Sequence, residues 1–591
     1  MECVAPSAVA LRPAFDALSW PPALRLVCRA WRDYFDASAP ARAHKWYLHP
    51  DHVAALPLDE LVRRLALRAR LRWLCLEIFL ERISDKTLAI LASGAVHAAT
   101  VSASALAGFE ERAIAALASL HRVTFRYSSA SLDVSALAGV HKIEFYYCSH
   151  LANVDALAGV HTLKIVGSHN IVDVSALGRV STLVLEECQG ITDVSVLGGV
   201  RDLTISACDN VRDFSALGNV PTIFIMSRSS AHTLPVFARD AFVTLASFPN
   251  LVDLSCVAAA RKVWLMGCEA VADVSPLRNV QELYVSRCDA IEDVSPLATV
   301  DSVAFYGCRG VSDVSALRGR HLSFQSCKGI VDISALAAVR TLCLSSCQNV
   351  HAMPTFENAD EIALMDTGIN AVSTLGNVRV LNLAHTQISD VSALGGVEDL
   401  TLAYCRQLSN VSALGNVRTL NLAGCDGVCD VSALGRVRTL NLSHCINVQD
   451  VSVLGGVHTL ILDYCSNVND VSALGKAWRL SLEGCTQIVD VSALGNAHCL
   501  NLTGCTNVED VSALGRVHTL CLSRCAKITD VSALGGVHTL NLNGCINITD
   551  FSALGGVRCL DLRGCAGGAH AAALPGVARL VEPDGTTIRR L

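Results

Sequence analysis

The sequence lacks a long uninterrupted apolar run, even though apolar residues are abundant in it. Hydrophobic residues make up 51% of the 591 residues, and the mean hydropathy is +0.41. No stretch approaches the roughly 18 consecutive apolar residues that a membrane-spanning helix needs, and the segment MECVAPSAVALRPAFDAL has no basic region before an apolar core. We therefore expect no membrane partner, no secretion signal, and a location in the cytoplasm or nucleus, where the compartment is reducing.

The chain also has little net charge and none of the short motifs of common enzyme classes. Its formal net charge is −7, which does not favour nucleic acid or anionic lipid as a general partner. There is no P-loop and no G-x-S-x-G sequence, and Cys and His residues pair only where the repeat generates the spacing. We predict a protein without enzymatic activity, without a cofactor and without a nucleic-acid partner.

The dominant feature of the chain is one phrase, D-V-S-A-L-G, that returns every 20 residues. Between copies runs the pattern V-x-x-L-x-L-x-x-C-x-x-[IV]. A fixed short period predicts a stack of similar rungs, which grows lengthwise and presents an extended binding surface. Regular copies begin at Asp430, Asp450, Asp470, Asp490, Asp510, Asp530 and Asp550.

Each repeat has room for one short strand and one return turn. If the aspartate is position 0, apolar residues stand at +1, +4, +7, +10, +12 and usually +18. The L-x-L at +10 and +12 has the period of a strand with one buried face. A repeat of 20 residues has no space for a full helix as well. D-V-S-A-L is therefore expected to form a turn or a 3₁₀ segment, in which Asp and Ser bond nearby backbone N–H groups.

The pattern V-x-x-L-x-L-x-x-C-x-x-I resembles the cysteine-containing leucine-rich repeat, in a form shortened to 20 residues. The resemblance extends over roughly residues 70–585 and recurs more than twenty times. It implies an α/β solenoid, a horseshoe or shallow arc of short rungs with one continuous parallel β-sheet. Residues 46–130 are expected to hold longer, helix-bearing repeats, with helices after Asp85 and at 110–117, and residues 131–591 to hold compact repeats.

A cysteine stands at +15 in most rungs, where the family has asparagine. Cysteine is small, usually buried and a weak S–H donor, so we expect a column of inward-pointing, reduced thiols. Zinc bound by C-x-x-x-C pairs, such as Cys343 with Cys347, and calcium bound along the aspartate column are the alternatives. The column comprises Cys148, Cys188, Cys208, Cys268, Cys288, Cys308, Cys327, Cys347 and the rungs from Cys405 to Cys565.

The N-terminal segment, residues 1–45, contains the amphipathic sequence PPALRLVCRAWRDYF, whose apolar residues have helical spacing. It resembles the second half of an F-box, and it precedes cysteine-type repeats as in the F-box adaptors of cullin-based ubiquitin ligases. The resemblance implies that this segment binds a Skp1-like adaptor within a cullin complex while the repeats hold an unknown protein substrate, and we expect a monomer outside that complex. The matching residues are Pro21, Pro22, Leu24, Leu26, Val27, Cys28 and Trp31.

A second function is left open by the sequence. The chain would then be a leucine-rich-repeat scaffold or inhibitor with no ubiquitin-ligase role. Its N-terminal helices would only cap the apolar surface of the first rung. Binding of a Skp1-like protein would distinguish the two.

Residues at +9 and +11 alternate with the buried leucines and are expected to line the concave face. From Asp390 onward these positions are mostly Thr and Asn, which make a poor interface centre. Earlier rungs carry aromatic and charged residues there, and the repeat degenerates at 226–252 and 351–371. We predict that a concave patch between residues 222 and 287 binds the partner through Phe224, Arg228, Lys262, Trp264, Glu282 and Tyr284.

Position +8 carries His or Arg in many rungs and forms a basic edge beside the sheet. The pattern favours a solvated rim offset by the aspartate column, and a docking site for an acidic or phosphorylated partner is the alternative. The residues are His141, His161, Arg201, Arg261, Arg340, Arg379, Arg418, Arg438, His458, His498, His518, His538 and Arg558.

Overall fold

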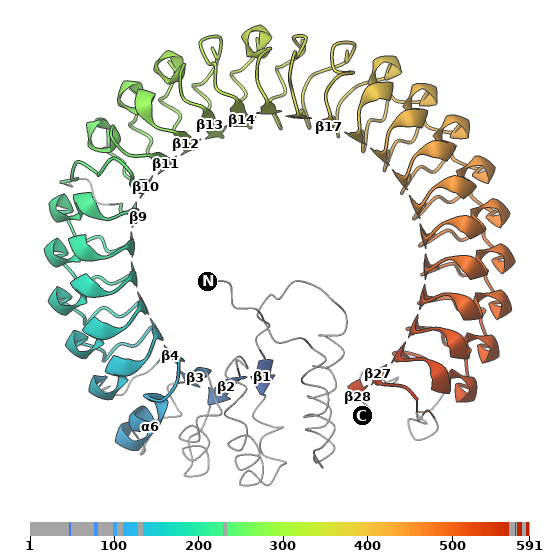
Figure 1. Ribbon diagram of the computed structural model, residues 1–591, viewed down its shortest axis with the longest axis horizontal. Coiled ribbons are helices and arrows are strands. Elements are labelled where there is room, and N and C mark those ends of the chain that lie inside the picture. The colour runs from blue at the N-terminus through green and yellow to red at the C-terminus, as the bar shows by residue number, and fades with distance from the viewer. Residues whose placement is uncertain are drawn as a thin grey trace, which may run out of the picture. The chain divides into compact units, whose positions relative to one another are not determined.

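The structure, a computed structural model, has two compact units, one from Arg42 to Ala335 and one that contains Leu336 to Leu591. In each unit the strands line one side of the stack and short 3₁₀ helices line the other (Figure 1). No helix in the described part of the chain is long and apolar enough to cross a membrane. The described residues are 46–48, 76–80, 98–102, 110–127, 134–228, 233–566, 574, 576–581 and 587–589.

In the unit Arg42–Ala335 each strand pairs in parallel with the next strand along the chain. Val123 lies opposite Ile143, and Ile143 lies opposite Leu163, so each repeat position stacks on itself. This is the parallel sheet of a leucine-rich-repeat solenoid, as predicted. The strands are β1 (Trp46–Leu48), β2 (Leu76–Leu80), β3 (Ala98–Ser102), β4 (Arg122–Arg126), β5 (Lys142–Tyr146), β6 (Thr162–Val166), β7 (Thr182–Glu186), β8 (Asp202–Ser206), β9 (Thr222–Met226), β10 (Phe242–Ala246), β11 (Lys262–Met266), β12 (Glu282–Ser286), β13 (Ser302–Tyr306) and β14 (His321–Gln325).

The return side of this unit begins with an α-helix and continues with 3₁₀ helices. The helix α6 (Glu110–Leu117) matches the prediction at 110–117, whereas the helix expected after Asp85 lies outside the described residues. D-V-S-A-L-G forms the predicted 3₁₀ segment, as in the rung that begins at Asp173. The 3₁₀ helices are η2 (Ser135–Gly139), η3 (Asp155–Gly159), η4 (Ser175–Arg179), η5 (Ser195–Gly199), η6 (Ser215–Asn219), η7 (Ser255–Val257), η8 (Ser275–Asn279), η9 (Ser295–Leu297) and η10 (Ser334–Leu336).

The unit Leu336–Leu591 has shorter strands and a different ending. From β15 to β27 the pairing is parallel, but β28 pairs antiparallel with β27, with Leu580 opposite Ile588. The repeat pattern does not predict this reversal. The strands are β15 (Thr341–Cys343), β16 (Glu361–Ala363), β17 (Val380–Asn382), β18 (Asp399–Thr401), β19 (Thr419–Asn421), β20 (Thr439–Asn441), β21 (Thr459–Ile461), β22 (Arg479–Ser481), β23 (Cys499–Asn501), β24 (Thr519–Cys521), β25 (Thr539–Asn541), β26 (Cys559–Asp561), β27 (Arg579–Val581) and β28 (Thr587–Arg589).

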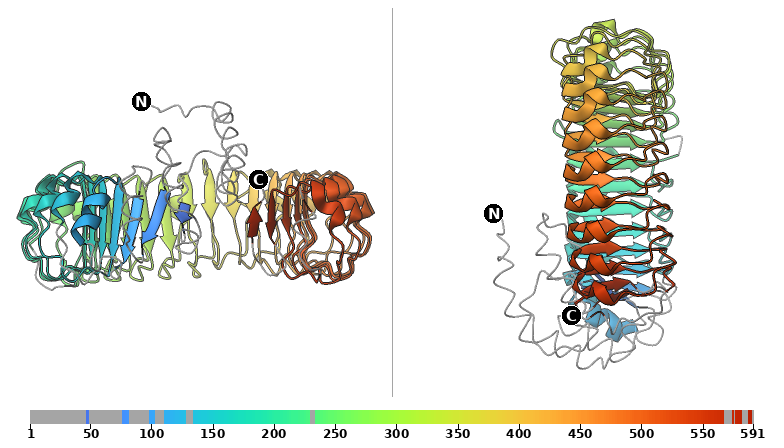
Figure 2. Two further views of the ribbon diagram at one scale, coloured as in Figure 1. Left: turned by 90° about the horizontal axis from the view of Figure 1, so that it is seen from below. Right: turned by 90° about the vertical axis from the view of Figure 1, so that its right-hand side faces the viewer.

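The 3₁₀ helices of this unit stack on one another in a column, which is visible in the right-hand view of Figure 2. Each of them starts two residues after the aspartate or asparagine that opens its repeat. They are η11 (Ser392–Gly396), η12 (Ser412–Asn416), η13 (Ser432–Arg436), η14 (Ser452–Gly456), η15 (Ser472–Lys476), η16 (Ser492–Asn496), η17 (Ser512–Arg516), η18 (Ser532–Gly536) and η19 (Ser552–Gly556).

In several of these rungs an asparagine at +11 bonds the backbone just beyond the short strand, although strands without it, such as β21 with Ile461 at this position, are equally short. Oδ1 of Asn421 accepts the N–H of Ala423 at 3.1 Å, and Oδ1 of Asn441 accepts the N–H of Ser443 at 2.9 Å. A side chain that bonds the backbone two residues ahead favours a turn over a continuing strand. From β4 to β14 no rung has asparagine at +11, and those strands run for five residues.

The core of each unit is a set of columns that run from rung to rung. Leu440 of β20 and Leu442, which follows that strand, are fully buried, and so is Leu434 of the 3₁₀ helix behind them. Burying one such side chain stabilises a protein by about 1.5–3 kcal/mol. In the unit Arg42–Ala335 aromatic rings join these columns, with Phe125 and Phe145 stacked at 5.2 Å. Each rung therefore depends on its neighbours for a closed core.

The residue at +14, which directly follows each strand from β4 to β14, has left-handed backbone in most described rungs. At Gly424 φ is +69°, and at Tyr404 it is +60°. This region costs a side-chain-bearing residue roughly 1–2 kcal/mol. The cost is offset by the sheet ladder, since the N–H of Tyr404 donates to the carbonyl oxygen of Ala423 on the next rung at 2.7 Å.

The two irregular stretches keep a buried layer with different side chains. In 226–252, Phe248 takes the place of the cysteine and is only 2% exposed, and residues 233–240 contain no 3₁₀ helix. In 351–371, the buried Thr367 takes that place, and its Oγ1 donates to the carbonyl oxygen of Leu364 at 2.7 Å. The rungs of Phe248 and Thr367 therefore keep a buried side chain at this position, whereas Arg228, which occupies it one rung before Phe248, is exposed.

Candidate protein-binding surface

The strands from β4 to β14 present +9, +11 and +13 on the exposed side of the sheet, which we call the strand face. In β12, Leu283 and Val285 are buried, while Glu282, Tyr284 and Ser286 are half-buried and point to the opposite side. This alternation follows from the pleat of a strand. The side chains at +9 and +11, which were selected from the sequence, therefore lie on the strand face.

Three aromatic rings from β10, β11 and β12 meet on this face. Trp264 packs edge-on against Phe242 with ring centroids 5.0 Å apart, and it packs against Tyr284 at 5.5 Å. We call Phe242, Trp264 and Tyr284 the aromatic cluster. The sequence indicated Trp264 and Tyr284 but not Phe242, because the irregular rung lacks the aspartate and cysteine that mark the repeat positions.

The indole N–H of Trp264 is buried, and it donates to no acceptor among the described residues. Leaving a buried donor without a partner costs about 1–3 kcal/mol. An acceptor supplied by a bound partner would remove that cost. The aromatic cluster therefore combines apolar area with an unfilled hydrogen bond.

An ion pair lies beside the aromatic cluster. Nζ of Lys262 is 2.5 Å from Oε2 of Glu282, and both side chains are more than one-third exposed. Lys262 and Glu282 stand opposite each other at +9 of β11 and β12, two residues before Trp264 and Tyr284. Four of the residues predicted from the sequence are thus brought together at one place.

The other two predicted residues lie elsewhere. Phe224 is half-buried in β9 and is separated from Trp264 by Thr244, which occupies the same position on β10 and is 4% exposed. Arg228 is exposed in the loop that follows β9, and its backbone N–H donates to Oδ1 of Asp209 at 3.2 Å. Neither has a described contact with the aromatic cluster.

A charged cluster around Glu144 lies on the strand face at β4 and β5. The Glu144 carboxylate accepts hydrogen bonds from Arg122 at 2.7 Å and Thr124 at 3.1 Å, and it lies 3.0 Å from Nζ of Lys142. Burial raises the pKa of Glu144, but hydrogen bonds from Arg122 and Lys142 outweigh it, so the pKa is lowered. This carboxylate already has its partners within the chain.

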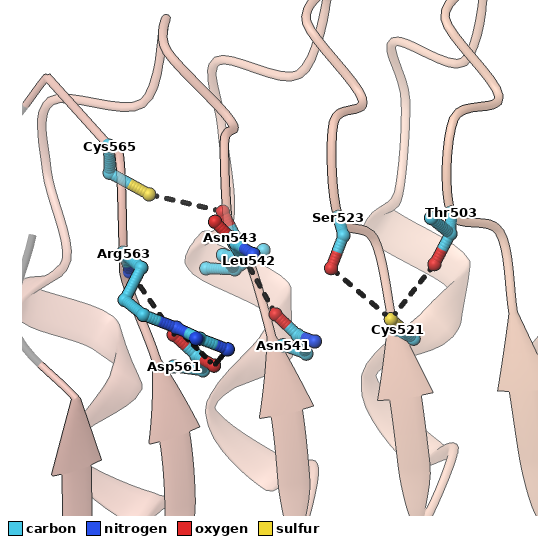
Figure 3. Close-up of polar contacts among 9 residues, drawn as sticks. All are labelled: Thr503, Cys521, Ser523, Asn541, Leu542, Asn543, Asp561, Arg563 and Cys565. Carbon is cyan, nitrogen blue, oxygen red and sulfur yellow. Dashed lines mark hydrogen bonds and ion pairs between the residues drawn. The ribbon is translucent and has the colours of Figure 1, made fainter. Parts of the chain in front are cut away.

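Figure 3 shows the strand face near the C-terminal end of the unit Leu336–Leu591. Sγ of Cys521 lies 3.1 Å from Oγ1 of Thr503 and 3.4 Å from Oγ of Ser523. Asp561 and Arg563 pair with each other at 2.7 Å. The strand-face side chains that Figure 3 labels are small or bonded to one another, and none of them is aromatic.

The cysteine column points into the core. Cys445 is fully buried, and its thiol donates to the carbonyl oxygen of Leu422, one rung earlier, at 3.1 Å. Burial raises the pKa of Cys445 to about 11. All described cysteines are free thiols, and no group of three or more His, Cys, Asp or Glu in the described residues could hold a metal ion. The geometry therefore explains this column by packing and by thiol hydrogen bonds.

The aspartate column is explained by the turn it opens. Oδ1 of Asp470 accepts the N–H of Ser472 at 2.9 Å. Hydrogen bonds from the backbone and then the side chain of Ser472 lower the pKa of Asp470. Asn410 makes the same contact to Ser412 at 3.0 Å. Because a neutral amide serves as well, the position needs an acceptor and does not need a charge or calcium.

The adaptor-binding residues predicted from the F-box resemblance lie outside the described residues. Their arrangement therefore stays a prediction. They are Pro21, Pro22, Leu24, Leu26, Val27, Cys28 and Trp31.

Comparison with known proteins finds no matching protein-family model and no matching curated protein. Among solved structures, the functional domain of InlJ from Listeria monocytogenes, which includes a cysteine ladder, is 16% identical over 66% of this chain and 74% of that chain, with a TM-score of 0.27. A Toll–Spatzle complex from Drosophila matches at 14% identity over 80% of this chain and 60% of that chain, with a TM-score of 0.34. The leucine-rich-repeat protein LIC12759 from Leptospira interrogans matches at 10% identity over 84% and 92%, with a TM-score of 0.22.

Proposed function

We propose that the chain is a protein-binding scaffold without an active site, and that the strand face of the unit Arg42–Ala335 holds a protein partner. The observation that carries this is the buried, unpaired indole N–H of Trp264 within the aromatic cluster. Interface hot spots are enriched in Trp and Tyr, and they gain most from groups that only the partner satisfies. A partner would place an apolar side chain on the rings and a carbonyl or carboxylate oxygen at Nε1.

The surroundings of the aromatic cluster support this assignment. Met226 and Met266, at +13 of β9 and β11, are half-buried on the same face. Methionine adapts its shape to a partner at little cost. The Lys262–Glu282 pair supplies the polar rim that surrounds the centre of a typical interface.

The more specific proposal is that this partner is a substrate, and that the chain is the substrate receptor of a Skp1–cullin–F-box ubiquitin ligase. It is supported by the resemblance of residues 21–31 to an F-box and by their place before cysteine-type repeats. In that role the adaptor segment and the aromatic cluster are separate in the chain, so each can be disabled alone. The alternative is a scaffold or inhibitor whose N-terminal segment caps the first rung.

The test is affinity purification of the tagged full-length chain, read by mass spectrometry for a Skp1-like protein, a cullin and further partners. Trp31→Ala should lose the Skp1-like protein and the cullin. Trp264→Ala should retain both and lose the substrate. Recovery of a substrate without any Skp1-like protein would favour the scaffold alternative.

A further variant of Trp264 separates the contribution of the hydrogen bond to affinity from that of the buried apolar area. Trp264→Phe keeps a ring at the site but removes the N–H, so affinity for the recovered substrate should fall by about tenfold. Ile461→Ala removes an apolar side chain at the same repeat position of β21 and should leave the affinity unchanged. Equal binding by Trp264→Ala and the parent chain would overturn the assignment of this surface.

A further inference from the structure

A row of stacked rings follows the +8 edge of the unit Leu336–Leu591. The ring centroids of His458 and Trp478 are 6.2 Å apart, and those of Trp478 and His498 are 4.1 Å apart. His498, His518 and His538 continue the row at 4.6 and 4.5 Å. An arginine extends it at each end. We call Arg438, His458, Trp478, His498, His518, His538 and Arg558 the histidine row.

The histidine row is held in place by the backbone and by threonines. The N–H of His458 donates to the carbonyl oxygen of Arg438 at 3.1 Å, and the pattern repeats along the sheet. Nδ1 of His458 lies 3.2 Å from the hydroxyl of Thr459, and Nδ1 of His518 lies 3.3 Å from that of Thr519. These hydrogen bonds use Nδ1, so Nε2 of His458 and His518 stays available to a ligand. Both histidines are exposed, and Trp478 is 52% exposed.

In the described part of the chain, the titratable side chains that flank the row at +6 and +9 are arginines, a lysine and cysteines, and none of them is a carboxylate. Arg479 follows Trp478, and thiols stand at the equivalent place in two other rungs. The 3₁₀ helices that lead into the row end in three further cations. These neighbours are Arg479, Cys499, Cys559, Arg436, Lys476 and Arg516.

The carboxylates of these rungs occupy other repeat positions than the histidine row. Each aspartate of the column precedes a 3₁₀ helix, and the row follows that helix, which spans about 10 Å at about 2 Å per residue. Asp463, Glu483 and Asp561 lie at or beyond the far end of their strands. Within the described residues, no carboxylate forms an ion pair with Arg438, and none is bonded to His458.

In other rungs of this unit, an arginine at +8 forms an ion pair with an acidic residue at +8 of the neighbouring rung. Nε of Arg340 is 2.5 Å from Oδ2 of Asp360, and Nη1 of Arg418 is 2.6 Å from Oε1 of Glu398. From Arg438 to Arg558 no acidic residue occupies +8. Within this unit, the rungs from Arg438 to His518 therefore combine the stacked rings with the absence of an acidic residue at +8.

Neighbouring imidazolium charges in such a stack would repel each other. Two unit charges at about 4 Å repel by roughly 1 kcal/mol in water and by about 4 kcal/mol near a protein surface. In the shorter stack of His121, His141 and His161, with centroids 4.4 and 4.5 Å apart, burial and then the two neighbouring histidines lower the pKa of His141. A bound carboxylate would offset this repulsion, so binding and protonation favour each other.

We propose that the histidine row binds an acidic peptide segment, and that it binds more tightly at about pH 5.5 than at about pH 7.5. This surface belongs to another unit and other residues than the aromatic cluster, so it stands independently of the proposed function. Seven rungs at about 4.8 Å spacing give a row of about 29 Å, which matches roughly nine residues of extended peptide at about 3.3 Å each.

A peptide fits this surface better than nucleic acid does. The chain as a whole carries a net charge of −7, and at +9, on the strand side of the row, Arg479 is the one basic residue in these seven rungs. The strand side of the row is otherwise flanked by neutral residues such as Thr459 and Thr519. Nucleic-acid interfaces use broad basic fields that attract many phosphates.

The test uses the full chain and a fluorescein-labelled peptide of about ten glutamates, which stays ionised at about pH 5.5 because the ordinary pKa of Glu is about 4.3. Fluorescence anisotropy should show affinity rising by about tenfold or more from about pH 7.5 to about pH 5.5. It should also show weakening as salt rises from about 50 to about 300 mM. A pH-independent affinity, or no binding, would overturn the proposal.

Matched variants locate the site. The triple change His498→Gln, His518→Gln and His538→Gln should abolish the pH dependence, and unchanged thermal unfolding would show that the rungs still fold. The control, His385→Gln with His444→Gln, removes two histidines at +14 of the same unit and should leave the pH dependence intact. Tighter binding of an oligothymidylate of similar length would reassign the row to nucleic acid.

Discussion

The ring of Tyr404 fills the space where a side chain at Gly424, one rung later, would lie. A β-carbon on Gly424 would come within 2.5 Å of Cδ1 of Tyr404, and φ at Gly424 is +69°. The other face of the ring stacks on His385, with centroids 4.8 Å apart. The same order of histidine, tyrosine and glycine returns at His444, Tyr464 and Gly484.

Gly424→Ala should therefore destabilise its unit for two reasons. The left-handed backbone costs alanine roughly 1–2 kcal/mol, and displacing Tyr404 from His385 costs about 0.5–1.5 kcal/mol more. Gly504→Ala is the matched control, since φ is +70° but no atom lies within 3.8 Å of the added β-carbon. Urea unfolding followed by circular dichroism should give a lower midpoint for Gly424→Ala than for Gly504→Ala. Equal midpoints would mean that the stacking of Tyr404 on His385 contributes nothing to stability.

Ser168 interrupts the cysteine column with a buried hydroxyl that has no partner. Oγ of Ser168 is inaccessible to solvent, and it makes no hydrogen bond among the described residues. Ser168→Cys should raise the free energy of unfolding by about 1 kcal/mol, because it replaces an unsatisfied hydroxyl with a larger, less polar group. Ser168→Ala, which removes the hydroxyl without filling the space, should gain less. A loss of stability in Ser168→Cys would contradict this account.

The sequence predicted the parts of the fold that repeat. Leu440 and Leu442 alternate with polar neighbours, so the strand and its buried face follow from hydrophobic period alone. The 3₁₀ helix followed from the limited length of the repeat, and the bond from Asp470 to the N–H of Ser472 followed from the usual chemistry of Asp before a turn. These features depend on neighbours that are close in sequence.

The features that the sequence did not predict depend on neighbours in other rungs. The left-handed position at +14 accepts Gly, Tyr, His and Arg, so no residue type marks it. Phe242 was missed because its rung has neither aspartate nor cysteine to fix the numbering, and only its pairing with Thr222 and Lys262 places it at +9. The stacking of His498 on His518 likewise follows from the rung spacing and not from either residue alone.

The aspartate column should make stability depend on pH in the acid range. Hydrogen bonds from Ser452 and Ser472 lower the pKa values of Asp450 and Asp470. The stabilisation is therefore complete above the ordinary Asp pKa of about 3.9 and is lost as pH falls through the lower value of the folded state. Melting temperatures measured from about pH 6 to about pH 3 should fall accordingly.

A triple change to asparagine tests the origin of this dependence. Asn410 already bonds Ser412 in the same way at 3.0 Å, so Asp450→Asn, Asp470→Asn and Asp490→Asn should fold normally at pH 7. The melting temperature of this variant should fall less between about pH 5 and about pH 3 than that of the parent. Parallel curves for the two proteins would place the acid sensitivity elsewhere.

Glu144 should stabilise the rungs of β4 and β5. Its side chain is 8% exposed and joins Arg122 and Lys142, so Glu144→Gln should cost about 1–3 kcal/mol by leaving two cations without their carboxylate. Glu186→Gln is the control, because that carboxylate is 38% exposed and lies 3.5 Å from Lys164, where an ion pair contributes less than about 1 kcal/mol. Hydrogen exchange of the β4 and β5 amides should increase in the first variant and not in the second.

Cys429 should be the described cysteine that reacts first with a thiol reagent in the folded protein. It is the exposed cysteine of the described residues, whereas Cys445 and Cys485 are buried. Burial raises the pKa of Cys445 to about 11 and that of Cys485 to about 12, so both remain protonated at pH 7 and lack the reactive thiolate. Iodoacetamide labelling read by peptide mass spectrometry should modify Cys429 under native conditions, and the column only after urea unfolding. Native labelling of Cys445 at the rate of Cys429 would show that the rungs open without denaturant, and Cys429→Ser should remove the fast phase among these residues.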